Sequence, residues 1–287
     1  MPLPSDLPIV DHHCHLSPHG DSVVAAERFR AAGGTHLFLS TQNYETTVPS
    51  ELTAYERQFE TTEALARRVT EATGVVVYIV VAPYPIDLVR LAPHAGVSVA
   101  AALHRTALDL AAKWVRERRA VALGEVGRPH FAVDDAALRA AGEELFDYAL
   151  VLAKESDCPA IVHCEDLGPQ ALSQLTERAR RAGLAPSRLV KHYARQRLSA
   201  GGPSTASKSY LARRELFTEV LGDPGPWFLE TDYLDDPGRP GAVLDLATVP
   251  RRAAWLAAQH PESVERLRVP FEESIHAVYG WRPEVRT

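Results

Sequence analysis

Short apolar runs alternate along the chain with longer stretches in which apolar residues recur at helical spacing. The runs are rich in β-branched residues, which is typical of strands. Seven strands are predicted: Pro8–His15, Thr35–Ser40, Gly74–Ala82, Ala120–Val126, Pro159–Cys164, Arg188–Tyr193 and Trp227–Asp232. An eighth strand is predicted near Leu198–Ser204, where the pattern is weakest.

The stretches between these runs have the pattern of amphipathic helices. Val99, Leu103 and Trp114 fall near one face of a predicted helix, and Leu138 and Leu145 do so in the next unit. Strands that alternate with such helices predict a parallel sheet covered by helices. We therefore predict an α/β fold, a (β/α)8 TIM barrel, as a single domain over residues 1–287, since such barrels take about 250 residues.

Composition and charge narrow the class of protein. The chain has 46% hydrophobic and 24% charged residues, as ordinary globular proteins do. Its net charge of −6 argues against a broad basic surface for duplex nucleic acid. Three cysteines argue against a disulfide framework and favour a reducing compartment. Neither a signal peptide nor a transmembrane segment is predicted, so we expect a cytoplasmic protein without a membrane partner.

The first predicted strand ends in a cluster of histidines. Because side chains alternate along a strand, His13 and His15 are predicted to point to one side with Asp11, and His12 and Cys14 to the other. Two imidazoles two residues apart form a chelating pair that suits zinc, iron, nickel and manganese. Such a pair occurs often by chance, so it indicates a metal site only together with other ligands.

Four later strands end in residues of the same kind. In a parallel barrel the carboxyl ends of all strands lie on one face, so these residues are expected to converge with the histidine pair. Carboxylates within apolar strands are rarely buried unless they are paired or bind a metal. The sequence therefore predicts a metal site made of His13, His15, Glu125, His163, His192 and Asp232.

These segments, in this order, resemble the TatD-type metal-dependent hydrolases of the amidohydrolase superfamily. The resemblance rests on DHHCH, GEVG, IVHCE, KHYA and ETDY, and it extends from residue 9 to about residue 236. The segments AAGGTHLFLS, GEVGRPHF, SKSYLARRE and ETDYLDDPGRPGAV are closest to an archaeal-type branch of that family.

The resemblance implies two divalent metal ions, which are zinc, manganese or magnesium. It implies that His13 and His15 bind the first ion, that Glu125 bridges both ions, and that His163 and His192 bind the second ion. Asp232 would contact the first ion and act as the general acid and base. The catalytic residues implied are therefore Asp232 and Glu125.

Two segments depart from the family pattern. Arg128, Pro129 and His130 follow Gly127 where the family commonly has Gly-Leu-Asp. Glu165 stands at a position where an arginine that could contact phosphate is common.

The substrate is less constrained than the metal site. Arg128 and His130, in the loop after Glu125, are the predicted substrate-binding residues. Further candidates for phosphate contacts are Lys191, Arg195, Lys208 and Arg239. The resemblance implies a phosphodiesterase or deoxyribonuclease that acts on single-stranded DNA or RNA ends.

Two alternatives stay open. One is a metal-dependent amidohydrolase or lactonase that cleaves a C–N or C–O bond of a small molecule, because the fold does not determine the chemistry. The other is a non-catalytic metal-binding scaffold. The C-terminal stretch from Pro250 is expected to close or flank the barrel, and it could supply a contact in a homo-oligomer.

Overall fold

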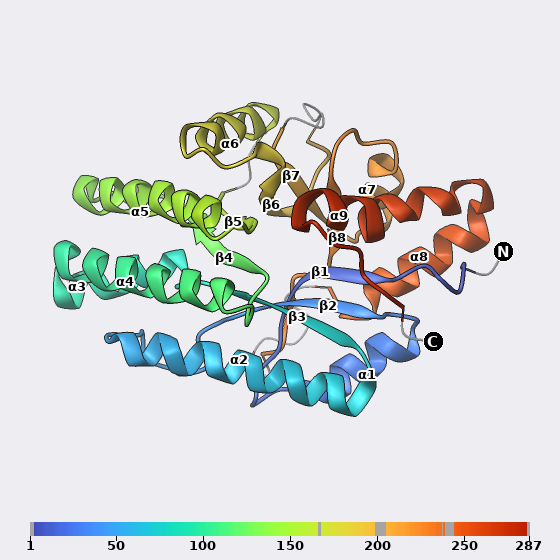
Figure 1. Ribbon diagram of the computed structural model, residues 1–287, viewed down its shortest axis with the longest axis horizontal. Coiled ribbons are helices and arrows are strands. Elements are labelled where there is room, and N and C mark those ends of the chain that lie inside the picture. Colours follow the sequence, from blue (N-terminus) through green and yellow to red (C-terminus); the bar gives the residue numbers. More distant parts are fainter. Residues whose placement is uncertain (1–2, 166–167, 199–204, 237, 239–243, 286–287) are drawn as a thin grey trace.

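Parallel strands form the centre of the molecule, and helices surround them (Figure 1). The computed structural model describes residues 3–165, 168–198, 205–236, 238 and 244–285. The strands are β1 (Val10–His15), β2 (His36–Ser40), β3 (Val76–Val81), β4 (Ala122–Gly127), β5 (Ala160–His163), β6 (Leu189–Ala194), β7 (Ser207–Leu211), β8 (Trp227–Glu230) and β9 (Tyr233–Leu234). The α-helices are α1 (Val23–Ala31), α2 (Leu52–Thr73), α3 (Pro85–Ala95), α4 (Val97–Arg116), α5 (Ala136–Glu155), α6 (Pro169–Arg181), α7 (Arg214–Val220), α8 (Thr248–Gln259) and α9 (Ser274–Tyr279). Short helical turns are η1 (Pro186–Arg188), η2 (Pro261–Leu267) and η3 (Val269–Glu273).

The sheet closes on itself through its last strand. Hydrogen bonds join the strands in the order β8-β7-β6-β5-β4-β3-β2-β1-β9. Only Thr231 and Asp232 separate β8 from β9, and β9 pairs with β1 through Cys14 and Tyr233. The final strand thus pairs with β7 in its first half and with β1 in its second half, which gives the TIM-barrel-like architecture that was predicted.

The seven predicted strands are all present, with small differences at their ends. The eighth strand was predicted near Leu198–Ser204, but residues 199–204 lie outside the described residues. The strand Ser207–Leu211 was not predicted. Its second residue is a lysine, so its sequence does not look like that of a buried strand. Lys208 is nevertheless buried, because its ammonium donates to Asp223 Oδ2 at 2.7 Å.

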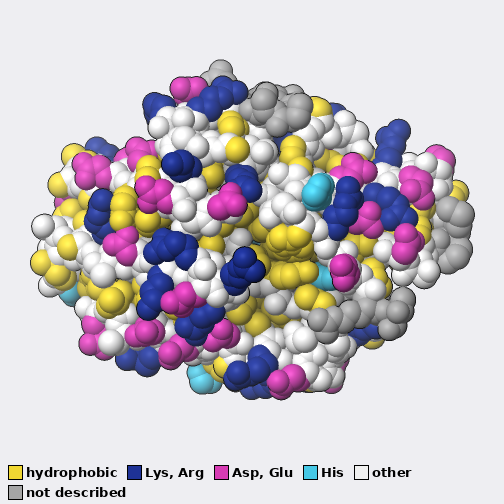
Figure 2. All heavy atoms as spheres, in the orientation of Figure 1, with side chains coloured by type: hydrophobic (Ala, Val, Ile, Leu, Met, Phe, Trp, Pro, Cys, Tyr) yellow, Lys and Arg dark blue, Asp and Glu magenta, His cyan; other side chains and the backbone are white. Residues whose placement is uncertain are grey.

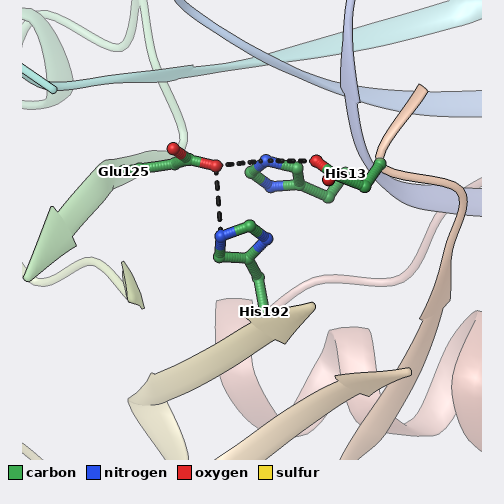
Figure 3. Close-up of side chains that lie close together, drawn as sticks. His13, Glu125 and His192 are labelled. Atoms are coloured by element: carbon green, nitrogen blue, oxygen red, sulfur yellow. Dashed lines mark ion pairs between the residues drawn. The ribbon is translucent and has the colours of Figure 1, made fainter. Parts of the chain in front are cut away.

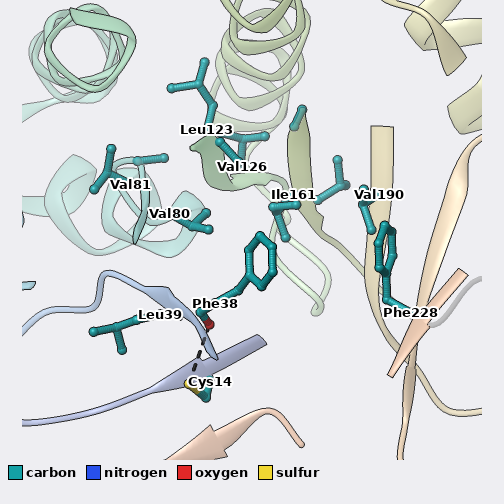
Figure 4. Packing of buried hydrophobic residues seen from close by; sticks show 14 of the residues in the cluster. Cys14, Phe38, Leu39, Val80, Val81, Leu123, Val126, Ile161, Val190 and Phe228 are labelled. Atoms are coloured by element: carbon teal, nitrogen blue, oxygen red, sulfur yellow. Dashed lines mark hydrogen bonds between the residues drawn. The ribbon is translucent and has the colours of Figure 1, made fainter. Parts of the chain in front are cut away.

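Side chains from many strands fill the barrel. Phe38, Ile161 and Phe228 come together between the strands that carry them (Figure 4). Among the helices, Trp114, Leu138 and Leu145 are buried as predicted. The prediction for Val99 was wrong, because its side chain is 59% exposed. The buried face of α4 is instead made largely of alanines, which allow this helix to lie close to both α3 and α5.

The C-terminal segment packs against the interior of the barrel, as expected for a segment that closes or flanks the barrel. The ring of Tyr279 lies 5.0 Å from that of Phe38, and Trp281 stacks on Phe38 at 6.2 Å between ring centroids. The backbone N–H of Trp227, at the start of β8, donates to Ser274 Oγ. These contacts lie at the end of the barrel opposite the carboxyl ends of the strands.

Cys14, Cys158 and Cys164 are all free and buried, so they pack as small apolar residues. Among the described residues, no helix is both long and apolar enough to cross a membrane.

Candidate metal centre

Four side chains from distant segments meet at the carboxyl ends of the strands. His13 on β1, Glu125 on β4, His192 on β6 and Asp232 after β8 offer ligand atoms that all lie within 4.8 Å of one another. Figure 3 shows Glu125 pointing from β4 toward the imidazoles of His13 and His192. The convergence expected from the barrel topology is therefore present.

Glu125 lies at the centre of this group. Its Oε1 atom is 2.8 Å from His13 Nε2 and 3.1 Å from His192 Nε2. The same oxygen is 3.6 Å from His15 Nε2, whereas Oε2 is 3.6 Å from His163 Nδ1. The two oxygens of one carboxylate thus face different histidines, which is the arrangement that a bridging ligand requires.

The remaining two predicted ligands flank the central four. His15 Nε2 lies 3.2 Å from His13 Nε2 and 3.7 Å from Asp232 Oδ1. His163 Nδ1 lies 3.2 Å from His192 Nε2. All six residues therefore belong to one connected group in the fold, while their individual roles as ligands stay predictions.

Neighbouring groups fix how the imidazoles face the centre. His15 Nδ1 donates to the carbonyl oxygen of Ser40, and His13 Nδ1 lies 3.2 Å from the Ser40 hydroxyl. His192 Nδ1 lies 3.5 Å from Oε1 of the buried Glu230. For His13 and His15 a partner on Nδ1 leaves Nε2 with its lone pair directed at the centre, as in metal-bound histidines. His192 Nδ1 makes no hydrogen bond among the described residues, although Glu230 lies beside it.

Burial and charge shift the pKa values of the two acidic residues in opposite directions. Burial raises the pKa of Glu125, but the nearby histidines, led by His192 and His163, more than offset this, so the pKa lies well below its usual range. Burial raises the pKa of Asp232 well above its usual range, and the charges of Glu230 and Glu125 add to the effect. Burial lowers the pKa of His163 to about 3, so this ring is neutral at pH 7.

The residues present fit a divalent cation. Imidazole nitrogens and carboxylate oxygens that lie this close together in a buried pocket need a positive charge between them, either a proton or a metal ion. Imidazole with carboxylate is a donor set that zinc, manganese and iron accept. The chain therefore carries a buried cluster that is consistent with metal binding, with His13, Glu125, His192 and Asp232 closest together.

The first strand is less regular than simple alternation predicts. The register of β1 against β2 shifts between Asp11 and Cys14, because β1 has one residue more than β2 over this stretch, as in a β-bulge. The carboxylate of Asp11 does not face the cluster, because it accepts hydrogen bonds from the hydroxyl and the backbone N–H of Thr231. Asp11 thus joins the last strand to the first one directly below the site.

The two predicted substrate-binding residues lie beside the cluster, one of them exposed and the other held in ion pairs. His130 Nδ1 is 3.0 Å from His163 Nε2, and its side chain is exposed. Arg128 is held by two carboxylates: it donates to Glu165 at 2.6 and 2.8 Å, and to Glu143 at 3.2 Å. Binding of substrate by either residue stays a prediction, and for Arg128 it would have to compete with these ion pairs.

The other described basic residues that were predicted to contact phosphate also interact with groups of the protein itself. Lys191 is buried and donates to the carbonyl oxygen of His192, and Lys208 is bound to Asp223. Arg195 lies over the ring of Tyr193. Arg239 lies outside the described residues. On the face drawn in Figure 2, basic and acidic side chains are interspersed, without a continuous basic stretch.

Three residues that support the site were not predicted. Ser40 ends an apolar strand and Glu230 stands two residues before Asp232, so both could have been found from their positions on strands. Asp235 directly follows β9. Its buried carboxylate accepts the backbone N–H groups of Ser17, Asp21 and Ser22, and so holds the loop after β1 against the end of β9. Only the fold brings that loop and Asp235 together.

Strand β8 ends with an unusual backbone conformation at the site. Asp232 has a φ of 50°, in the left-handed region that non-glycine residues rarely adopt. Its N–H donates to the carbonyl oxygen of His13, which ties the turn to β1. Such conformations persist where the surrounding structure holds them, and they are common at functional sites.

The fold and the ligand set agree with three comparisons. Residues 10–280 match the family model described as TatD related DNase. The uncharacterized protein MJ1127 of the archaeon Methanocaldococcus jannaschii is 28% identical over 283 residues, which cover 97% of this chain and 98% of that protein.

Two solved structures have a similar fold. YjjV, a TatD homolog of Escherichia coli, has a TM-score of 0.58 at 20% identity, with 95% of this chain and 98% of that chain covered. The TatD-like protein AF1765 of Archaeoglobus fulgidus has a TM-score of 0.58 at 16% identity, with 91% and 100% covered. The chain therefore belongs to the TatD-related DNase family and is a TatD-family metal-dependent hydrolase.

Proposed function

We propose that this protein hydrolyses a phosphodiester bond at a single-stranded DNA or RNA end, with two divalent metal ions and a metal-activated water. The observation that carries the proposal is the convergence of four side chains of ligand type from distant segments, with their ligand atoms within 4.8 Å of one another. The family model, whose description names a DNase, supports the choice of bond. The two oxygens of Glu125, which face different histidines, support the proposed count of two ions.

The roles of the protein's own groups follow from where they lie. When bound, divalent ions at such a site lower the pKa of a coordinated water and polarise the bond under attack. Among the predicted ligands the side chain of Asp232 is the most exposed, at 18%, compared with 6% for Glu125 and 0% for His13. Asp232 is therefore the carboxylate that can reach both the attacking water and the substrate, and we assign to it the acceptance of the proton and its delivery to the leaving group.

Cleavage of end-labelled DNA tests this function. The protein is stripped with a chelator, restored in turn with Mn²⁺, Zn²⁺ or Mg²⁺, and incubated with 3′-end-labelled single-stranded DNA. Asp232→Asn serves as the control variant, because it keeps the shape of the side chain and removes the proton acceptor. We expect metal-dependent release of nucleotides that falls by about 100-fold or more in the variant. Absence of cleavage with about two bound ions per chain would contradict the phosphodiesterase assignment.

One specific observation favours a second candidate function. Arg128, the cation best placed to meet a phosphate, is neutralised by Glu165 and Glu143. A site whose nearby arginine is already paired favours an uncharged substrate, so the second candidate is hydrolysis of a C–O or C–N bond in a small molecule. Aryl esters, lactones and amides assayed under the same metal conditions, with the same Asp232→Asn control, distinguish this function from the first.

A further inference from the structure

A cavity of about 360 Å³ lies beside the metal cluster and has no role in the site described so far. It is formed by α3, α4 and α5 together with the loop that follows β4. Its walls are mainly apolar and include Leu88, Val89, Leu138 and Leu145. Phe131, which is 45% exposed, lies on the same loop at the opening. The volume suits a substituted ring or a short branched chain.

The cavity shares a wall with the metal cluster. His130 lines the cavity, and its Nδ1 atom is 3.0 Å from Nε2 of the predicted ligand His163. Arg128 also lines it, and the backbone N–H of Arg128 donates to the carbonyl oxygen of His163. A substrate whose reacting bond lies at the cluster can therefore extend past His130 into this space.

One wall of the cavity contains a largely buried histidine. His104 on α4 lines the cavity and is 6% exposed, whereas its Nδ1 atom is closed off from solvent and has no hydrogen-bond partner among the described residues. A buried polar atom without a partner is unfavourable, so native proteins usually satisfy it with a protein group, a water or a ligand. Gly142 on α5 also lines the cavity, and a Cβ there would meet only Leu88, at 3.8 Å. This glycine keeps open space in the middle of a helix, where alanine would be more stable.

The charged residues that line the cavity do not favour an anionic occupant. Arg128 uses its guanidinium on Glu165 and Glu143, and both of these carboxylates line the cavity as well. Arg139, the other arginine in the lining, donates to the carbonyl oxygens of Val133 and Asp134. The two arginines and the two carboxylates balance in charge, so the lining offers no net positive charge to a phosphate or carboxylate, and an uncharged group fits it without a desolvation penalty for a charge.

We infer that this cavity is a substrate subsite that receives an uncharged, mainly apolar ring carrying one hydrogen-bonding group, which pairs with His104. The inference rests on the second candidate function, hydrolysis of an uncharged small molecule, because the subsite holds the part of the substrate attached to the bond being cut. It favours the small-molecule substrate of the second candidate function over a nucleic acid end. Gly142, His104 and Phe131 are then residues that determine specificity.

Binding of small probes tests the chemistry of the cavity without any turnover. The full-length protein, with a chelator present, is titrated with 4-methylphenol, toluene and thymidine, and binding is followed by NMR line broadening of the probes. We expect 4-methylphenol to bind at least 10-fold more tightly than toluene, and thymidine to bind more weakly than both. His104→Leu is expected to make the affinities for 4-methylphenol and toluene equal. Preferential binding of thymidine, or no binding of any probe, would overturn the inference.

A pair of glycine variants locates the binding and controls for folding. Gly142→Leu fills the cavity and is expected to weaken binding of 4-methylphenol by at least 10-fold. Gly142→Ala is the matched control, because its methyl group makes only ordinary contact with Leu88. It is expected to keep binding while raising the melting temperature, since alanine is the better helix former. Binding that survives Gly142→Leu would place the probes elsewhere and overturn the assignment.

Hydrolysis by the metal-loaded protein separates this inference from the proposed function. With 4-methylphenyl acetate, Gly142→Leu is expected to raise KM by at least 10-fold, whereas with methyl acetate kcat/KM is expected to stay unchanged. An unchanged KM for the aryl ester would overturn the role as a subsite. Failure of the wild type to hydrolyse any ester, amide or phosphodiester would instead contradict the proposed function, and the chelator-treated titration would still report on the cavity.

Discussion

His12 and His13 are neighbours in the chain, yet they lie in two layers of the barrel with different chemistry. His13 faces Glu125 at 2.8 Å and Asp232 at 3.7 Å, in the layer of predicted metal ligands. His12 stacks on Phe228 at 3.8 Å between ring centroids, and its Nε2 lies 2.9 Å from the hydroxyl of Tyr279. The irregular pairing of β1 allows both rings to be buried one after the other.

The difference shows that the surroundings, and not the residue type, decide what a buried histidine can do. Burial among aromatic rings lowers the pKa of His12 well below its usual range, so this ring is a neutral packing element. The layer above contains carboxylates whose charge a cation can balance. Four predictions use this contrast, ordered from the largest expected effect to the smallest.

Replacing the carboxylate at the centre of the upper layer should have the largest effect. In Glu125→Gln the amide keeps the shape but removes the negative charge that faces four imidazoles. We expect metal affinity to fall by more than about 100-fold, because the loss of even an indirect partner costs about 10–100-fold. Metal content after dialysis measures this loss. Glu165→Gln, which changes a carboxylate outside the cluster, should retain its metal, and an unchanged metal content in Glu125→Gln would refute the site.

Glu230 should affect metal binding by positioning His192. Its buried carboxylate lies 3.5 Å from His192 Nδ1 and accepts the backbone N–H of Tyr193 at 2.6 Å. In Glu230→Gln we expect metal affinity to fall by about 10–100-fold, since the orientation of the ring is less well fixed. A competition titration with a metal-binding dye gives the dissociation constant. The exposed Glu215→Gln is the control, and equal affinities in the two variants would show that Glu230 does not position His192.

The effect of acid on stability should reveal a histidine held neutral by apolar surroundings. Burial lowers the pKa of His104 from 6.5 to about 4. As the pH falls below about 6.5 the unfolded chain binds this proton first, so the folded state loses stability until the pH reaches about 4. At pH 5 the loss should be about 2 kcal/mol. Urea unfolding at pH 7 and pH 5 measures this drop in the free energy of unfolding. In His104→Leu the drop between the two pH values should be smaller by about 2 kcal/mol than in the wild type. Equal losses in both proteins would show that His104 titrates normally.

The lower layer should tolerate replacement of its histidine at modest cost. In His12→Phe the ring stacking on Phe228 is kept, but the buried hydroxyl of Tyr279 loses its partner. We expect the free energy of unfolding to fall by about 1–2 kcal/mol, and metal affinity to stay unchanged. Denaturant unfolding and the metal titration report the two quantities. The double variant with Tyr279→Phe should recover part of the loss, and a collapse of metal affinity would mean that the two layers are not independent.

Much of the architecture could be predicted because it depends on local pattern. Seven strands follow from apolar runs bounded by turns, and the convergence of His13, Glu125 and Asp232 follows from the rule that parallel strands end on one face. The strand Ser207–Leu211 was not predicted, and there is a physical reason. Its lysine is neutralised by Asp223, a partner that the local sequence does not reveal.

Supporting contacts were harder to predict than the ligands. Glu230 and Asp235 act on groups in other strands and loops, so their partners depend on how the last strand bends at Asp232. The pairing of Arg128 with Glu165 joins two loops that are 37 positions apart in the chain. Both departures from the family pattern thus meet in one ion pair, which the separate segments could not show.

The sequence by itself determined the parallel α/β plan and the residue types that would line its mouth, because strand period, apolar content and side-chain chemistry are local properties. Only the tertiary structure decided which of these side chains face one another. It made His12 a packing residue, placed Arg128 between two carboxylates, and opened a cavity around His104. The physical reason is that pairing, burial and open space depend on groups from several elements at once, and no single segment of the chain contains them.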